Sequence, residues 1–448
     1  MIWEGFHYAD SGYGEATRQY VFALQDLGVP VTAKVAESPD DRPRLPRATV
    51  RRLETLVQRA PQPWEVHVQQ MLPPQFGLDH EAIANVGYTV FEAETIPQRW
   101  VQACNRMDEV WVPSEFCVGT FAASGVRRTK LRVIPHGVEV EHFGPHVEPL
   151  AVRSEKRFTF LSVFDWVWRK GWDLLVRAYY SEFDASEDVR LVIRSSRVRP
   201  QELHSFLARE FRPGPRPELV LLPFAIPREA MPRLYASADA FVVPSRGEGW
   251  GLAYGEAMAS GLPTIATNWG GQLDFMNSQN AYLIDYERLV PIDEEVRSTL
   301  GAEQGLRWVE PSLDHLRWLM RWVFEHPEEA REKGQLARAT ICDRATWGQA
   351  ALRIREAARA LGEPSLHAPG LALEDLVGPG PAMPANRSQD SLGSAVLARL
   401  AELEEADDIA AAILAELRMN APGSLKDRVL RRMRGRRQVT GGQGGGSL

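Results

Sequence analysis

Cysteine is scarce in this sequence: Cys104, Cys117 and Cys342 are the three among 448 residues. They lie far from any CxxC or Cys/His spacing, so neither a disulfide framework nor a structural zinc site is expected. No stretch reaches the roughly 18 uninterrupted apolar residues of a membrane-spanning helix. The N-terminus, Met1–Gly5, runs at once into polar residues, so no signal peptide is expected. We therefore expect a reduced, cytoplasmic protein.

An excess of basic residues is also lacking. The 52 Lys and Arg residues face 59 Asp and Glu residues, which gives a net charge of −7. Broad nucleic-acid binding needs a basic surface that neutralises phosphates, so we expect no nucleic-acid partner. The length predicts two or three domains.

The hydrophobic periodicity predicts an α/β fold with mostly parallel sheets, because strand-like runs alternate with helical patterns. In the first part, the expected strands are 29–35, 65–68, 86–91, 109–112 and 131–134, and the expected helices are 15–27, 96–106 and 115–123. In the second part, the expected strands are 158–163, 189–193, 219–222, 238–243 and 262–266, and the expected helices are 171–180, 202–210, 228–236, 253–260, 313–324 and 347–361. Two doubly wound domains facing each other follow from this order.

The last part of the chain has a different composition. Residues 364–386 are rich in Gly, Pro and Ala, as in a flexible linker, and 392–417 show an Ala/Leu/Glu-rich helical pattern. Residues 425–437 are strongly basic, and a Gly-rich tail follows, which we expect to be disordered. Two interpretations stay open for residues 425–437: a solvated tail, or peripheral contact with anionic lipids at the inner membrane face. The preceding helical pattern could pair with another chain.

The most informative stretch, 245–261, follows an expected strand and opens an expected helix. Open α/β sheets bind ligands at the carboxyl ends of their strands. Gly249 and Gly251 let the backbone approach a ligand, and a helix start favours a phosphate. Glu248 in the loop and Glu256 about two helical turns later could grip hydroxyls at two points of one long polar ligand. Taken singly, each carboxylate could also be an ordinary solvated charge.

This stretch resembles a known family. Glu248 and Glu256 form the E-x7-E pattern of retaining GT4-type glycosyltransferases, which have the GT-B fold, and 257–263 resemble that family's continuation of the motif. Residues 134–138, 169–175 and 270–271 resemble further family motifs. The resemblance covers nearly all of residues 1–361.

The resemblance implies two Rossmann-like domains facing across a cleft, plus a C-terminal helical or disordered extension. The implied boundaries are 1–150 for an acceptor-side domain, 151–345 for a nucleotide-sugar-binding domain, 346–362 for a helix that returns to the first domain, and 363–448 for the extension. The implied activity is the transfer of a sugar from a nucleotide-diphosphate sugar to a glycan, lipid or protein, with the anomeric configuration retained. The sugar, the base and the acceptor are not diagnosed by any residue.

Roles follow from the same resemblance. Glu256 would bind the ribose hydroxyls and Glu248 the transferred sugar, while backbone N–H groups near Gly249, Trp250, Gly251 and Leu252 would meet sugar and phosphate oxygens. Lys170, with Arg169 as helper, would neutralise the diphosphate leaving group, where negative charge develops. Lys170 could otherwise be a surface charge, but cations are disfavoured at a helix start unless an anion binds there.

The N-terminal stretch Asp10–Glu15 resembles the family's Gly-rich first loop, in which Gly12, Tyr13 and Gly14 would reach toward the donor. A tight turn explains this GxG equally well. It lacks the third glycine and the later acidic residue of a dinucleotide site, which disfavours a nicotinamide enzyme.

The sequence departs from the family pattern in one important place. Many relatives have a histidine near the transferred sugar, whereas residues 87–97 contain none. Glu92 or Glu94 could supply the missing polar contact, and Glu92 is the stronger candidate. His136 belongs to the interdomain turn and is expected to be structural.

The chain contains no D-x-D motif, which the other common transferase fold uses to hold a metal. We therefore expect no metal site and no cofactor beyond the donor itself. Two alternatives stay open: a non-catalytic GT-B relative that acts as a binding module, and a GT-B phosphorylase or epimerase.

Overall fold

A computed structural model describes residues 1–9, 11–37, 45–61, 65–150, 157–195, 198–223, 226–300 and 305–362. Residues 1–358 form one compact unit. The predictions for Asp10 and for the extension 363–448 lie outside the described residues.

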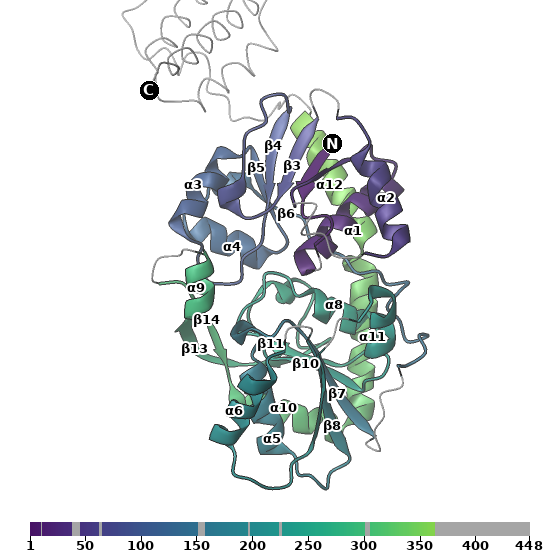
Figure 1. Ribbon diagram of the computed structural model, residues 1–448, viewed down its shortest axis with the longest axis vertical. Coiled ribbons are helices and arrows are strands. Elements are labelled where there is room, and N and C mark those ends of the chain that lie inside the picture. The colour runs from purple at the N-terminus through teal and green to yellow at the C-terminus, as the bar shows by residue number, and fades with distance from the viewer. Residues whose placement is uncertain are drawn as a thin grey trace, which may run out of the picture. The chain divides into compact units, whose positions relative to one another are not determined.

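The first half of this unit contains a six-stranded parallel sheet (Figure 1). Its strands are β1 (Ile2–Gly5), β2 (Thr32–Val35), β3 (Val66–Gln70), β4 (Ala84–Tyr88), β5 (Glu109–Val112) and β6 (Leu131–Val133), in the order β2-β1-β3-β4-β5-β6. The helical segments are α1 (Gly12–Asp26), α2 (Arg47–Val57), η2 (Pro73–Gln75), α3 (Gln98–Arg106), α4 (Glu115–Ala123) and η3 (Arg128–Lys130). Every residue of β3 and β4 is buried, as expected for strands covered on both faces.

The second half repeats this architecture. Its parallel strands are β7 (Phe158–Val163), β8 (Val189–Arg194), β9 (Glu218–Leu222), β10 (Ala240–Val243), β11 (Thr264–Thr267) and β12 (Tyr282–Ile284), in the order β12-β11-β10-β7-β8-β9. The helical segments are η4 (Trp168–Lys170), α5 (Trp172–Glu182), α6 (Pro200–Glu210), η5 (Arg228–Ala230), α7 (Met231–Tyr235), α8 (Leu252–Ala259), η6 (Gly271–Asp274), α10 (Leu313–Glu325) and α11 (Pro327–Arg344). The structure therefore confirms the two doubly wound domains that the alternation of strands and helices predicts.

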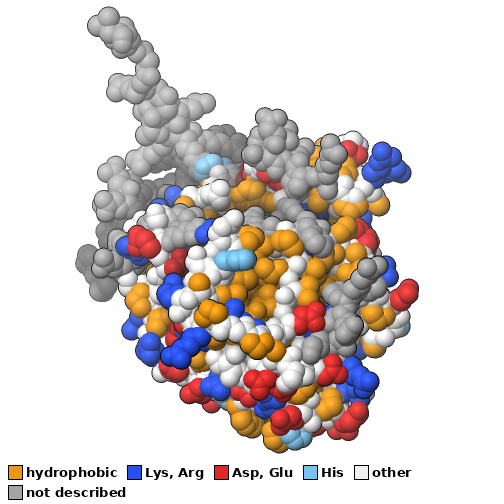
Figure 2. All heavy atoms as spheres, turned by 60° about the horizontal axis from the view of Figure 1, so that its bottom comes forward, with side chains coloured by type: hydrophobic (Ala, Val, Ile, Leu, Met, Phe, Trp, Pro, Cys, Tyr) orange, Lys and Arg blue, Asp and Glu red, His pale blue; other side chains and the backbone are white. Residues whose placement is uncertain are grey.

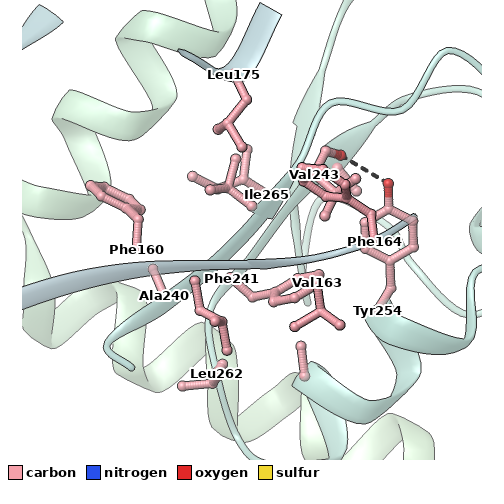
Figure 3. Packing of buried hydrophobic residues seen from close by; sticks show 14 of the residues in the cluster. Phe160, Val163, Phe164, Leu175, Ala240, Phe241, Val243, Tyr254, Leu262 and Ile265 are labelled. Atoms are coloured by element: carbon pink, nitrogen blue, oxygen red, sulfur yellow. Dashed lines mark hydrogen bonds between the residues drawn. The ribbon is translucent and has the colours of Figure 1, made fainter. Parts of the chain in front are cut away.

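The core of the second half fixes the junction between β10 and α8. Phe160, Phe241 and Ile265 from neighbouring strands pack together in the buried cluster that Figure 3 shows. On the helix side, the Tyr254 hydroxyl donates a hydrogen bond of 2.8 Å to the carbonyl oxygen of Val243. The first turn of α8 is therefore tied to the last residue of β10, which holds the intervening loop in place.

A small antiparallel hairpin extends from the second half toward the first. Strands β13 (Tyr286–Pro291) and β14 (Arg307–Pro311) pair with each other, and α9 (Glu294–Leu300) lies between them in the sequence. Figure 1 shows the described residues of this segment, 286–300 and 305–311, on the same side of the molecule as α3 and α4. We call it the bridging arm, because its Ile292, Leu306 and Trp308 join a buried cluster formed mainly by first-half residues.

The last described helix, α12 (Trp347–Gly362), starts beside the first half. The ring of Trp347 lies 5.1 Å from that of Tyr20 in α1, and an isolated bridge joins Thr346 to Val138. Figure 1 shows α12 next to α1. The second half thus sends its final helix back to the first.

Several local predictions differ from the structure. The helix expected over 228–236 is divided into η5 and α7, with Pro232 in the first turn of α7, where the missing N–H of proline is tolerated. Helices α2 and α11 and the bridging arm were not predicted. No described helix is both long and apolar enough to cross a membrane.

The face seen in Figure 2 carries mixed charges. Lys and Arg side chains alternate there with Asp and Glu side chains around a central area of hydrophobic ones. The basic residues on that face are therefore scattered rather than gathered into one patch.

Candidate active site in the cleft between the two halves

A cleft with a cavity volume of about 870 Å³ lies between the two halves. Both halves contribute to its lining, which includes Gly12, Tyr13, Glu15 and Glu92 from the first half and Lys170, Arg228, Glu248, Gly251 and Glu256 from the second. The second-half residues follow strands β7, β9 and β10, so they gather at the carboxyl edge of that sheet, where open α/β sheets bind ligands.

The loop after β10 depends on glycine. Gly251 has φ of +90°, and a Cβ there would lie 2.4 Å from the Tyr254 ring, so a side chain is excluded by both backbone and space. Gly251 is also the N-cap of α8. The first N–H groups of a helix have no intrahelical partners, and those of α8 begin at the cleft.

Gly249 lines the cleft, and it is also packed tightly against the first half. A Cβ at Gly249 would lie 2.0 Å from Val90 Cγ2, and a Cβ at Gly247 would lie 2.1 Å from the carbonyl oxygen of Glu92. In addition, Ser114 Oγ donates a hydrogen bond of 2.7 Å to the carbonyl oxygen of Gly249. These glycines therefore permit close packing of the loop on the first half.

Glu248 is almost fully buried and faces two cations. Lys170 Nζ donates a hydrogen bond of 2.6 Å to Glu248 Oε1, and Arg169 Nη1 lies 3.5 Å from Glu248 Oε2. Burial alone would raise the pKa of the Glu248 carboxyl, but Lys170 and Arg169 together lower it below its ordinary value. The structure therefore brings the predicted residues Glu248, Lys170 and Arg169 into one ionic cluster.

Glu92 joins this cluster from the opposite half. Arg169 Nη2 lies 3.2 Å from Glu92 Oε1, while Arg169 Nη1 donates to the carbonyl oxygen of Gly247 at 2.6 Å. Glu94, the alternative from the sequence, instead accepts a 2.6 Å hydrogen bond from Arg307 in the bridging arm. Of the two candidates, Glu92 alone is among the residues that line the cleft.

Glu256 lies in α8 and is held by two partners. The Tyr235 hydroxyl donates a 2.8 Å hydrogen bond to Glu256 Oε2, and Arg228 forms an ion pair with Glu256 Oε1. Arg228 also pairs with Glu139 at 2.8 Å and with Glu15 at 3.3 Å. Burial alone would lower the pKa of Arg228, but these three carboxylates raise it above its ordinary value. Sequence reasoning missed Arg228, because its partners are far apart in the sequence.

The N-terminal Gly-rich loop begins helix α1. Ser11 is the N-cap and accepts a 3.1 Å hydrogen bond from the Gly14 N–H. A Cβ at Gly14 would lie 2.2 Å from the carbonyl oxygen of Ala9, so Gly14 is explained by this turn. A Cβ at Gly12 would lie 3.7 Å from Leu252 Cδ1, so the loop does meet the start of α8 across the cleft.

Tyr13, Trp250 and His136 also line the cleft. The Tyr13 hydroxyl donates a hydrogen bond of 3.3 Å to the carbonyl oxygen of Met71. Trp250 is 5% exposed, and its ring lies 6.2 Å from that of His136. His136 Nδ1 is 2.9 Å from the Tyr20 hydroxyl, and burial lowers the pKa of His136 to about 3. Neutral His136 thus has a structural position, although its ring borders the cleft.

The second half of the chain is similar to a known protein family. Residues 155–297 match the family described as Glycosyl transferases group 1. This segment is a group 1 glycosyl transferase domain. It contains the ionic cluster residues Arg169, Lys170 and Glu248 as well as Glu256 and Arg228.

Curated relatives match parts of the chain. A GDP-mannose-dependent alpha-(1-6)-phosphatidylinositol monomannoside mannosyltransferase from Mycolicibacterium smegmatis is 26% identical over 235 residues, which is 48% of this chain and 60% of that protein. A mannosylfructose-phosphate synthase from Agrobacterium fabrum is 27% identical over 156 residues, 33% of this chain and 34% of that protein. The chain thus spans between about a third and 60% of the length of these two relatives.

Solved structures match over much more of their length. Anabaena HepE in complex with UDP-glucose has a TM-score of 0.58 at 14% identity, covering 80% of this chain and 99% of that one. A glycosyltransferase from Rickettsia africae has a TM-score of 0.59 at 14% identity, covering 81% and 98%. The chain therefore has the GT-B fold, and the predicted resemblance to glycosyltransferases of this fold is confirmed. The finer assignment to GT4 stays a prediction.

Proposed function

We propose that this protein is a retaining glycosyltransferase that moves a sugar from a nucleotide-diphosphate sugar to an acceptor without a metal ion. One observation carries the proposal: Lys170, Glu248, Glu256 and the start of α8 all border a single cleft. Similarity to a GDP-mannose-dependent mannosyltransferase, and to a structure solved with UDP-glucose, supports the same choice of donor class.

The donor would lie along the carboxyl edge of the second sheet. Its ribose would bind Glu256, which Tyr235 and Arg228 already hold in place. Its diphosphate would meet the N–H groups at the start of α8 and the ammonium of Lys170. The transferred sugar would then lie near Glu248 and Glu92, which both form ion pairs with Arg169.

The chemistry follows from where charge develops. When the bond between the anomeric carbon and the diphosphate oxygen breaks, negative charge grows on that oxygen, and a cation fixed nearby stabilises this state most. The acceptor hydroxyl attacks on the face that the diphosphate vacates. Its proton passes to the leaving diphosphate, and a new bond forms between the anomeric carbon and the acceptor oxygen. This sequence retains the configuration and needs no protein nucleophile.

Arg169 has a positioning role in this account. It binds Glu92, Glu248 and the carbonyl oxygen of Gly247 at once, so it links the first half to the loop before α8. Glu92 takes the polar position that a histidine has in many proteins of the family that the motifs resemble. We assign Glu92 to contact with the transferred sugar.

The test is incubation of the purified protein with a panel of nucleotide sugars and candidate glycan, lipid and protein acceptors. We expect release of nucleoside diphosphate with at least one donor and a product of unchanged anomeric configuration by NMR. Binding of a donor without any release would favour the alternative of a non-catalytic binding module. Release that depends on added phosphate, or isomerisation of the donor sugar, would indicate a phosphorylase or an epimerase.

A further inference from the structure

In the described part of the chain, five cationic side chains line the cleft, and four of them are already paired. Arg18 pairs with Glu15 at 2.8 Å, while Arg169, Lys170 and Arg228 pair with the carboxylates described above. Arg194 is the exception: among the described residues, no hydrogen bond or ion pair involves its guanidinium, and its Nε is buried without an acceptor. A buried donor without an acceptor destabilises the folded protein, and a bound ligand could supply the missing acceptor.

Arg194 is the last residue of β8, at the carboxyl edge of the sheet. It lies opposite Val163 at the end of β7, and the Phe164 N–H donates a 3.2 Å hydrogen bond to its carbonyl oxygen. The next strand outward is β9, which leads to Ile226 and Pro227 in the wall of the cleft. Arg194 therefore lines the same cleft as these two apolar residues.

This part of the cleft adjoins the Glu256 end. Tyr235, which donates to Glu256, has a pKa raised by burial and then by Glu256, and the charges of Arg228 and Arg194 oppose that rise. Arg194 is therefore within electrostatic range of the Tyr235–Glu256 hydrogen bond. If Glu256 holds the ribose and Lys170 the diphosphate, the base attached to the ribose must extend away from Lys170, toward β8 and β9.

We propose that Arg194 binds the base of the donor and selects guanine, so that the donor is a GDP-sugar; this inference rests on the proposed function. A guanidinium has donors only, arranged in a planar fork, and no acceptor. Guanine offers the two acceptors O6 and N7 side by side, which arginine binds in a bidentate manner. The apolar side chains of Phe164, Ile226 and Met231 line the same cleft and supply surface against which a purine face can pack.

Other bases fit this fork less well. Adenine has N7 as an acceptor, but its N6 amino group is a donor that meets the guanidinium donors unfavourably. Cytosine has the same defect at N4, and uracil offers O4 alone on that edge. We therefore expect the order of affinity GDP, then UDP, then ADP.

The experiment measures binding of GDP, UDP and ADP to the full-length protein by isothermal titration calorimetry. The wild type is compared with Arg194→Gln, which removes the charge, and with Arg194→Lys, which keeps the charge but loses the planar fork. Arg331→Gln is the matched control, because Arg331 is exposed in α11 and paired with Glu328. A bidentate contact predicts that GDP binds the wild type roughly 10- to 100-fold more tightly than ADP.

Arg194→Gln is expected to lose most of this preference while still binding ADP, Arg194→Lys to show a reduced preference, and Arg331→Gln to keep the full preference. Circular dichroism shows whether each variant is folded, and Arg194→Lys provides the test if Arg194→Gln is not. Tighter binding of UDP or ADP than of GDP, or a preference for GDP that is undiminished in Arg194→Lys and Arg194→Gln, would overturn the inference and leave the proposed function intact. Failure of all three nucleotides to bind the wild type would overturn both.

Discussion

The ammonium of Lys170 lies 2.6 Å from Glu248 Oε1; Lys170 ends η4, which follows β7, and Glu248 lies in the loop that follows β10. Lys170 precedes α5, whose N-cap, Gly171, has φ of +69°. A Cβ at Gly171 would lie 2.0 Å from the carbonyl oxygen of Pro244, so this glycine lets the Lys170 loop pack against the Glu248 loop. The pair is therefore built by two tight turns in contact.

Replacing Lys170 tests its proposed role at the leaving group. We expect Lys170→Met to lower kcat by about 10²–10³-fold, because a fixed charge at the developing anion is lost. The measurement is steady-state release of nucleoside diphosphate. Lys34→Met is the matched control, since Lys34 is 55% exposed and pairs with Glu4 on the surface. Equal rates for wild type and Lys170→Met would remove Lys170 from the mechanism.

Glu256 is expected to act on donor affinity. Glu256→Gln replaces the carboxylate that would accept charged hydrogen bonds from the ribose with a neutral amide. The donor KM should therefore rise by roughly 10- to 150-fold, which corresponds to about 1.5–3 kcal/mol. Tyr235→Phe should cause a smaller rise, because it removes the hydroxyl that orients Glu256 but keeps the carboxylate. Glu328→Gln, on the surface of α11, should leave KM unchanged. An unaltered donor KM in Glu256→Gln would contradict the ribose contact.

His136 predicts a pH dependence of stability. Its pKa is about 3 in the folded chain against 6.5 ordinarily, because burial disfavours the charged ring. Between these values the unfolded state binds more protons, so the free energy of unfolding should fall as pH falls, by up to about 1.4 kcal/mol per pH unit. Denaturant unfolding from pH 6.5 to 4 should show a smaller slope in His136→Gln than in the wild type. The exposed His204→Gln provides the control, and identical slopes in all three proteins would refute the account.

The bridging arm is expected to stabilise the contact between the halves. Trp308 is 1% exposed and shares a buried cluster with Phe91 and Trp100, and the Glu94 N–H donates to the carbonyl oxygen of Arg307 at 2.9 Å. Trp308→Ala should therefore cost about 3–5 kcal/mol. Trp318 is 53% exposed on α10, so Trp318→Ala should change stability by less than about 0.5 kcal/mol. Calorimetric unfolding checks both, and similar losses would show that the arm adds nothing specific.

Metal independence is a separate prediction. The charge of the leaving diphosphate is assigned to Lys170 and to the N–H groups of α8, so EDTA should leave the transfer rate unchanged. The rate is measured before and after dialysis against EDTA, and again after addition of Mg²⁺ or Mn²⁺. A strict requirement for either cation would contradict the metal-free mechanism.

Much of this arrangement can be predicted from local sequence. The sequence places Glu248 just after an expected strand and Glu256 eight positions later in an expected helix. This spacing correctly predicts that Glu248 lies in a loop and Glu256 on the following helix. Lys170 stands two residues before α5, as its motif indicates. These positions depend on residues that are close in the sequence, so the periodicity of helices and strands predicts them.

The remainder depends on contacts between distant parts of the chain. Arg228 meets Glu15, Glu139 and Glu256, which no spacing connects. Gly249 lines the cleft as its motif indicates, but its tight contact with Val90 of the other half could not be predicted from the motif. The bridging arm interrupts the α/β alternation and is stabilised by burial against the first half, which a periodicity search within the second half does not detect.

The most direct test of the central claim is a crystal structure of the protein with a bound nucleoside diphosphate. The account predicts that the phosphates lie against Lys170 and the first N–H groups of α8, with both ribose hydroxyls within hydrogen-bond distance of Glu256. A nucleotide bound elsewhere, or a ribose directed away from Glu256, would contradict it.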